Sequence, residues 1–165
     1  MQYFDDTLKD QPFEVMAARL RSEIGAAERG LRAISEEVAG IPRAAGKWSR
    51  KEVLGHLIDS ASNNHQRFAR AEEGATLRLP GYAQDRWVAS QGYRESRWTD
   101  LVDLWSAYNR HIAHVLQRIP ESFRDLPYEI GGGAAVPLSF VALDYIGHLQ
   151  HHLSQILDTP ARGPD

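Results

Sequence analysis

The sequence predicts an all-α protein that folds as a four-helix bundle with a long connection between the second and third helices. In four segments, apolar residues recur at intervals of three and four, which is the period of an amphipathic helix. Glycines and prolines gather between these segments and mark turns. Four such helices in 165 residues bury their apolar faces most simply against one another, so we expect a single domain over residues 1–165.

The first helix is expected over residues 12–38. Pro12 suits a first helical turn, and Gly40 and Pro42 end the segment. Its apolar stripe consists of Phe13, Met16, Leu20, Ile24, Leu31, Ile34 and Val38.

The second helix is expected to begin after Ser49 and to continue to about Glu72. Ser49 and Glu52 have the spacing of a capping box, in which each side chain bonds the backbone of the other residue. One face of this helix begins apolar and becomes polar, which in a small bundle indicates a site. This face carries Val53, His56, Leu57, Ser60, Asn63, Asn64 and Arg67.

The rest of the chain contains two connections and two helices. Residues 74–98 are expected to form a long connection whose aromatic residues pack on the bundle. The third helix should run from about Thr99 to just before Pro120. Residues 120–137 should form a glycine turn between two short extended pieces. The fourth helix is expected over residues 138–157 with Ser139 as its cap, and the tail after it should be frayed.

Composition narrows the classes of function. The formal net charge is −3, so no basic surface is available for nucleic acid or for an anionic membrane. The absence of cysteine excludes disulfides, thiolate metal sites and a cysteine nucleophile. No signal peptide and no apolar run of about 20 residues is present, so we expect a soluble, cytoplasmic protein.

The stretch HLQHH, residues 148–152, is the strongest functional signal. His148 and His152 lie one turn apart on one face of a helix and can bind one metal ion together. Leu149 stands where HExxH metalloproteases carry a glutamate, so that mechanism is not indicated. The chain has seven histidines, and simple hydrogen-bonded or solvated histidines are the alternative. Flanking apolar residues place the pair beside the core, which favours a site.

Three segments resemble the DinB-like superfamily, in particular its branch of metal-dependent hydrolases and bacillithiol S-transferases. These are KWSRKEVLGHLIDSASNNHQRF, LPGYAQDRW and DYIGHLQHHLSQI, in the same order and spacing from about Gly46 to Ile156. The resemblance implies a DinB-like four-helix bundle and a divalent metal ion, with zinc or nickel favoured. It places the metal ligands at His56, His148 and His152, and excludes His151.

The resemblance also marks pocket residues, each with a plainer alternative. Asp59 would accept a hydrogen bond from a ligand imidazole, or would be an exposed helix acid. Arg67 and Asn63 would hold polar groups of a substrate, or Arg67 would form a surface ion pair. Tyr82 would donate a proton or stack on substrate, whereas Trp87 would pack the loop. His65, His111 and His114 are not expected to be ligands.

The sequence therefore predicts a divalent-metal-dependent enzyme that acts on a small molecule. The resemblance favours thiol S-transfer, with a low-molecular-weight thiol as substrate, over hydrolysis. The alternative is a non-catalytic metal-binding or stress-related ligand-binding protein. Neither nucleic acid nor a membrane is expected as a partner, and a homodimer remains open.

Overall fold

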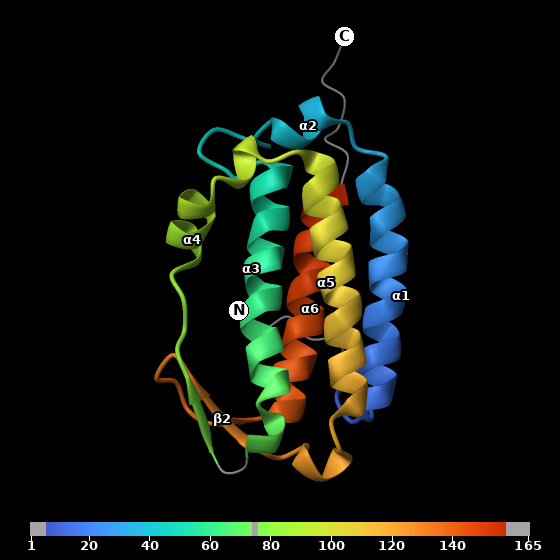
Figure 1. The fold of residues 1–165 in the computed structure, drawn as a ribbon, viewed down its shortest axis with the longest axis vertical. Helices are drawn as coiled ribbons and strands as arrows, with labels where there is room; N and C mark the ends of the chain where they lie inside the picture. Colours follow the sequence, from blue (N-terminus) through green and yellow to red (C-terminus); the bar gives the residue numbers. More distant parts are fainter. Residues whose placement is uncertain (1–5, 74–75, 158–165) are drawn as a thin grey trace.

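The computed structural model describes residues 6–73 and 76–157, and four long helices form its body (Figure 1). Helix α1 (Phe13–Arg32) and helix α3 (Arg50–Ala69) each pack against both α5 (Trp98–Arg118) and α6 (Leu138–Leu157). The chain is therefore an all-α four-helix bundle, as predicted, with α1 and α3 at diagonal corners.

The connection between α3 and α5 determines the directions in which helices α5 and α6 run. In Figure 1, α3 and α5 both descend, while α1 and α6 ascend. This arrangement requires the chain to climb back along the outside of α3 before α5 begins. The sequence left this crossover open, and the structure shows it.

The climbing connection is more regular than the sequence predicted. It contains β1 (Leu77–Leu79), α4 (Gln84–Gln91) and a 3-10 turn, η3 (Tyr93–Glu95). Tyr93 and Trp98 pack into the core as expected, but Trp87 is 37% exposed and lies against Tyr82, with ring centroids 4.9 Å apart. Helix α4 has no strong apolar stripe, so the periodicity of the sequence does not indicate a helix there.

The expected first helix is wrong at its C-terminal end. Helix α1 ends at Arg32, and a separate short helix, α2 (Glu36–Gly40), follows. The break occurs at Ser35, whose Oγ accepts a hydrogen bond from the backbone N–H of Val38 at 3.3 Å. An N-cap of this kind starts a new helix, although the apolar spacing continues through it.

The ends of the other helices agree only in part with the prediction. Ser49 and Glu52 form the predicted capping box at the start of α3. The helix ends at Ala69, and the expected extension to Glu72 is instead a 3-10 turn, η2 (Ala71–Glu73). Ser139 is not the cap of α6, because that helix already begins at Leu138. The predicted frayed tail lies outside the described residues.

A small sheet closes the lower end of the bundle. Strand β2 (Pro127–Ile130) pairs parallel with β1 and antiparallel with β3 (Val136–Pro137). The turn between β2 and β3 has Gly131 and Gly132 at positive φ, which confirms the predicted glycine turn between short extended pieces. In the described part of the chain, no helix is long and apolar enough to cross a membrane.

Candidate metal centre

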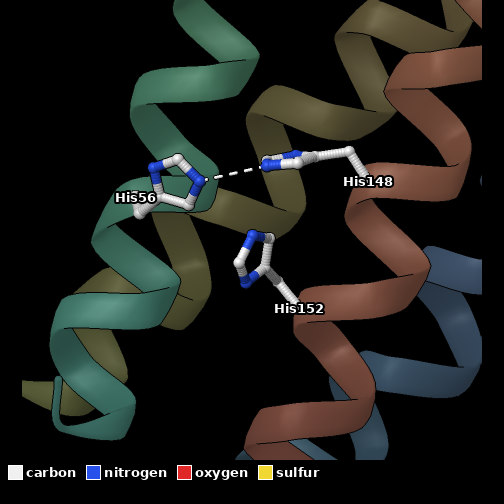
Figure 2. A group of neighbouring side chains, drawn as sticks. All are labelled: His56, His148 and His152. Atoms are coloured by element: carbon white, nitrogen blue, oxygen red, sulfur yellow. Dashed lines mark hydrogen bonds between the residues drawn. The ribbon is translucent and has the colours of Figure 1, made fainter. Parts of the chain in front are cut away.

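Two neighbouring helices bring the predicted ligands together. His56 comes from the N-terminal half of α3 and is only 1% exposed. His148 and His152 project from one face of α6, one turn apart, and are half-buried. Figure 2 shows the three imidazoles pointing toward one another across the space between α3 and α6.

The spacing of the ring nitrogens suits a single ion. The Nε2 atoms of His56 and His148 lie 3.1 Å apart, and one nitrogen from each of the three rings lies within 4.8 Å of the others. Two ligands bound to a tetrahedral ion at about 2.0–2.1 Å lie about 3.4 Å from each other. The three imidazoles therefore need only small adjustments to share one ion.

Hydrogen bonds orient two of the three rings. Nδ1 of His152 lies 3.0 Å from Oε1 of Gln155. An amide oxygen can only accept, so this contact assigns the proton to Nδ1 and leaves the Nε2 lone pair for a ligand. Nδ1 of His148 lies 3.4 Å from Oγ of Ser60. Partners of this kind hold the imidazoles of metal sites in place.

The surroundings keep the imidazoles neutral. Burial, with a smaller contribution from His152, lowers the pKa of His56 to about 4. Burial and the neighbouring histidines lower the pKa of His148 to about 3, and burial also lowers that of His152. Neutral imidazole is the form that binds metal, so the group is ready to coordinate an ion at neutral pH. Nδ1 of His56 is buried without a hydrogen-bond partner among the described residues.

Asp59 lies near the centre but not as predicted. Its Oδ1 accepts hydrogen bonds from the hydroxyl of Tyr93 at 2.6 Å and from Nε2 of Gln91 at 2.5 Å, while no described residue bonds its Oδ2. It does not accept from His56, and at 2% exposure it is not a solvated acid either. Asp59 lies about one turn beyond His56 on α3, and its side chain faces the returning connection. Burial raises its pKa.

Ser60 connects Tyr82 with the candidate centre. Its side chain interacts with that of Tyr82 and in turn contacts His148, so the phenol is one residue removed from a candidate ligand. Burial and the nearby Asp59 raise the pKa of Tyr82 to about 12. The phenol is therefore protonated at neutral pH and can donate a proton or a hydrogen bond.

Arg67 and Asn63 lie further along α3. Arg67 is half-buried, and its guanidinium donates to Oδ1 of Asn64 at 3.1 Å and interacts electrostatically with the carboxylate of Asp144. Asn63 donates to the backbone oxygen of Asp59 at 2.9 Å. Asn63 and Arg67 both line a cavity of about 210 Å³ that extends to Leu79. Arg67 is thus an interior cation rather than part of an exposed pair.

A larger cavity lies on the other side of the ligands. Its volume is about 520 Å³, and its walls include Lys47, Trp48, Val53, Asp85 and Gln155. The Trp48 ring is 5.3 Å from the ring of His56, and Gln155 is the partner of His152. Two residues of the cavity wall, Trp48 and Gln155, therefore contact candidate ligands, and the cavity is large enough for a small molecule.

The structure adds Gln155, Gln91 and Tyr93 to the residues that the sequence singled out. Ser60, which the sequence places on the same face as His56, contacts His148, and Gln155 lies one turn beyond His152, a spacing that was the available signal. Gln91 and Tyr93 come from the connection, and no pattern in the sequence connects them with Asp59. His151 contacts the ring of His152 and the amide of Gln155, beside the centre.

Comparison with known proteins agrees with this architecture. A family model described as the DinB superfamily matches residues 19–156. A protein of Geobacillus thermodenitrificans, provisionally named a metal-dependent hydrolase, is 24% identical over 149 residues, which cover 88% of this chain and 82% of that protein.

Two solved structures share the fold. YfiT from Bacillus subtilis, described as a probable metal-dependent hydrolase with an unusual four-helix bundle topology, superposes with a TM-score of 0.76 at 16% identity, over 87% of this chain and 83% of that one. The mycothiol-dependent maleylpyruvate isomerase gives a TM-score of 0.68 at 16% identity, over 87% of this chain but only 60% of that one. Because the family model spans most of the sequence, the chain belongs to the DinB superfamily.

Proposed function

We propose that this protein is a divalent-metal-dependent enzyme that acts on a small molecule, with the ion bound by His56, His148 and His152. The observation that carries the proposal is the convergence of three neutral imidazoles from two helices, with their nitrogens within 4.8 Å of one another. Three protein ligands leave a coordination position open, as in catalytic zinc sites. The names of the related hydrolases support a metal-dependent reaction.

An imidazole-only set suits zinc or nickel better than magnesium or calcium, which prefer oxygen ligands. When bound, such an ion acidifies a water or a thiol at its open position and so provides a nucleophile at neutral pH. The ordering of the rings by Ser60 and Gln155 is then part of the centre, because it keeps the ligand nitrogens aimed at the ion.

The residues of the chain supply the remaining functions. Tyr82, which stays protonated, donates a hydrogen bond or a proton to the substrate or leaving group. Arg67 and Asn63 hold a negatively charged or polar part of the substrate further along α3. The cavity at Trp48 admits the substrate beside the ligands. Asp59, held by Tyr93 and Gln91, positions the connection that carries Tyr82.

We favour thiol S-transfer to a small electrophile, with a low-molecular-weight thiol as the metal-activated substrate. The fold shared with a mycothiol-dependent isomerase supports this choice. Hydrolysis of a small molecule is the second candidate, because two relatives are named as hydrolases.

One screen tests both reactions. Protein purified without a histidine tag is analysed for bound metal and then assayed with several thiols against electrophiles, and with ester and amide substrates. Metal-dependent turnover that disappears in His148→Ala supports an enzyme, and the substrate that reacts identifies the class. Stoichiometric metal without turnover above that of free metal would instead favour a ligand-binding protein.

A further inference from the structure

A second group of histidines lies where α3 packs against α5. It consists of His65 on α3 and of Tyr108, His111 and His114 on α5. His65 and Tyr108 are half-buried, whereas His111 and His114 are exposed. Neither the candidate metal centre nor the proposed reaction uses any of these residues.

Tyr108 fixes the orientation of His65. The hydroxyl of Tyr108 lies 3.1 Å from Nδ1 of His65, and the two rings meet edge to face with centroids 5.5 Å apart. Ligand histidines in metal sites characteristically use one ring nitrogen for such an anchor and the other for the ion. With Nδ1 engaged, Nε2 of His65 remains as the coordinating atom.

His111 stands at the distance from His65 that ligand rings keep in the first centre. The His65 and His111 centroids are 5.0 Å apart with their planes at 82°. In the first centre, the three ring pairs are 4.5 to 5.0 Å apart at 71° to 78°. The two groups therefore share the same inclined, edge-to-face arrangement, although only the first has three converging nitrogens.

His114 can join the pair after a rotation. Its ring is 6.5 Å from that of His111 and nearly parallel to it, so it does not now point at a common ion. It is exposed and lies one turn beyond His111, so its side chain is free of packing that would oppose a new rotamer. The nearby Arg110 is bonded to Glu28 on α1, which partly neutralises its charge.

We propose that His65 and His111 form a second metal site for a borderline transition-metal ion such as Zn²⁺ or Cu²⁺, with His114 as a third ligand. Imidazole is a preferred ligand of these ions, and water completes the coordination at this exposed position. Burial and the neighbouring His111 also lower the pKa of His65, which keeps it neutral near pH 7. Because only His65 and His111 already lie close together, this site should bind metal more weakly than the first centre.

Calorimetric titration with Zn²⁺ in the His148→Ala/His152→Ala background isolates the second site, because the first centre then keeps only one of its three candidate ligands, His56. One equivalent should still bind. Adding His65→Ala or His111→Ala should abolish this step, whereas adding Gln66→Ala, which changes an exposed neighbour on α3, should leave it intact. Tyr108→Phe removes the anchor and should weaken binding about tenfold. Circular dichroism checks that every variant is folded.

Site-specific evidence comes from NMR spectra of the histidine rings with substoichiometric Cu²⁺, which broadens nuclei near the ion. In the His148→Ala/His152→Ala variant, the ring signals of His65 and His111 should broaden first. Zinc binding that survives the loss of both His65 and His111, or initial broadening confined to other histidines, would overturn the proposal. Unchanged affinity in Tyr108→Phe would overturn the assignment of His65 Nε2 as ligand atom.

Discussion

His148 contacts both of the other candidate ligands and one polar neighbour from α3. Its ring faces His56 at 3.1 Å between Nε2 atoms, touches Ser60 through Nδ1, and lies 4.5 Å from the ring of His152. At the scale of single residues, the centre is thus a set of imidazoles whose second nitrogens are partly used for orientation. Removing one ring removes a ligand and also releases its neighbours.

His148→Ala is expected to abolish stoichiometric binding at the first centre and any metal-dependent activity together. Tag-free protein is measured by elemental analysis after brief dialysis against a weak chelator, which removes ions from weaker sites. His151→Ala is the matched control, because His151 lies on the same helix beside His152 and contacts Gln155 and the His152 ring, but is not a predicted ligand. Loss of this metal in His151→Ala alone would mean that the ligand set is wrong.

Arg67→Ala is expected to retain the metal but to weaken the enzyme toward a charged substrate. Losing one charge-assisted hydrogen bond costs about 1.5–3 kcal/mol, or roughly a ten- to hundred-fold loss of kcat/KM. Arg19→Ala is the control, because Arg19 is exposed on α1, pairs with Glu23 and does not line the cavity at Arg67. Equal losses of kcat/KM in the two variants would show that Arg67 does not bind the substrate.

At the scale of elements, the returning connection is held against α3 by a close contact at Gly55. A Cβ atom at Gly55 would lie 2.1 Å from the ring of Tyr93, so only glycine allows η3 to approach this closely. From that position the hydroxyl of Tyr93 reaches Asp59. The residue before a candidate ligand therefore also determines where the segment carrying Tyr82 can lie.

Gly55→Ala is expected to lower the free energy of unfolding by about 1–3 kcal/mol, because the ring of Tyr93 must move away from α3. Gly25→Ala on α1 is the control, since its added Cβ meets no atom within 4 Å. That substitution should instead stabilise the protein by about 0.5–1 kcal/mol through helix propensity. Urea unfolding followed by circular dichroism measures both, and equal effects would contradict the close contact.

At the scale of the whole molecule, burial of neutral histidines links stability to pH. The folded pKa values of His56 and His148, about 4 and about 3, lie below the unfolded value of about 6.5. Between these limits the unfolded chain binds more protons, so acid favours unfolding. The stabilisation is complete above pH 6.5 and is lost as the pH falls toward 4.

Metal-free protein should therefore lose up to about 1.4 kcal/mol of unfolding free energy per pH unit and per buried histidine below pH 6.5. Unfolding curves of the metal-free protein and of His148→Ala at several pH values measure how much of this pH dependence comes from the His148 ring. Metal affinity of the folded protein at the first centre should change little between pH 7 and about pH 5 and fall as the pH approaches the folded pKa values of about 4 and about 3, because only there do protons compete for the nitrogens. A steep loss of affinity between roughly pH 7 and pH 6 would contradict a centre of buried, neutral imidazoles.

The sequence by itself determined the helices and the spacing of the candidate ligands. The apolar periodicity located four bundle helices, the capping box located the start of α3, and HxxxH placed two imidazoles on one face of α6. These features are local, since they depend on residues within a turn or two of one another. The break at Ser35 was also local, but the continuing apolar pattern concealed it.

Tertiary structure alone decided which helix faces meet and which way the connection runs. Asp59 bonds Tyr93 and Gln91, more than 30 residues away, instead of a ligand one turn above it. His65 pairs with His111 across α3 and α5. Such contacts depend on the relative rotation of packed helices and on the path of a crossover, and side-chain packing over the whole bundle sets both. Periodicity within one segment carries no information about either.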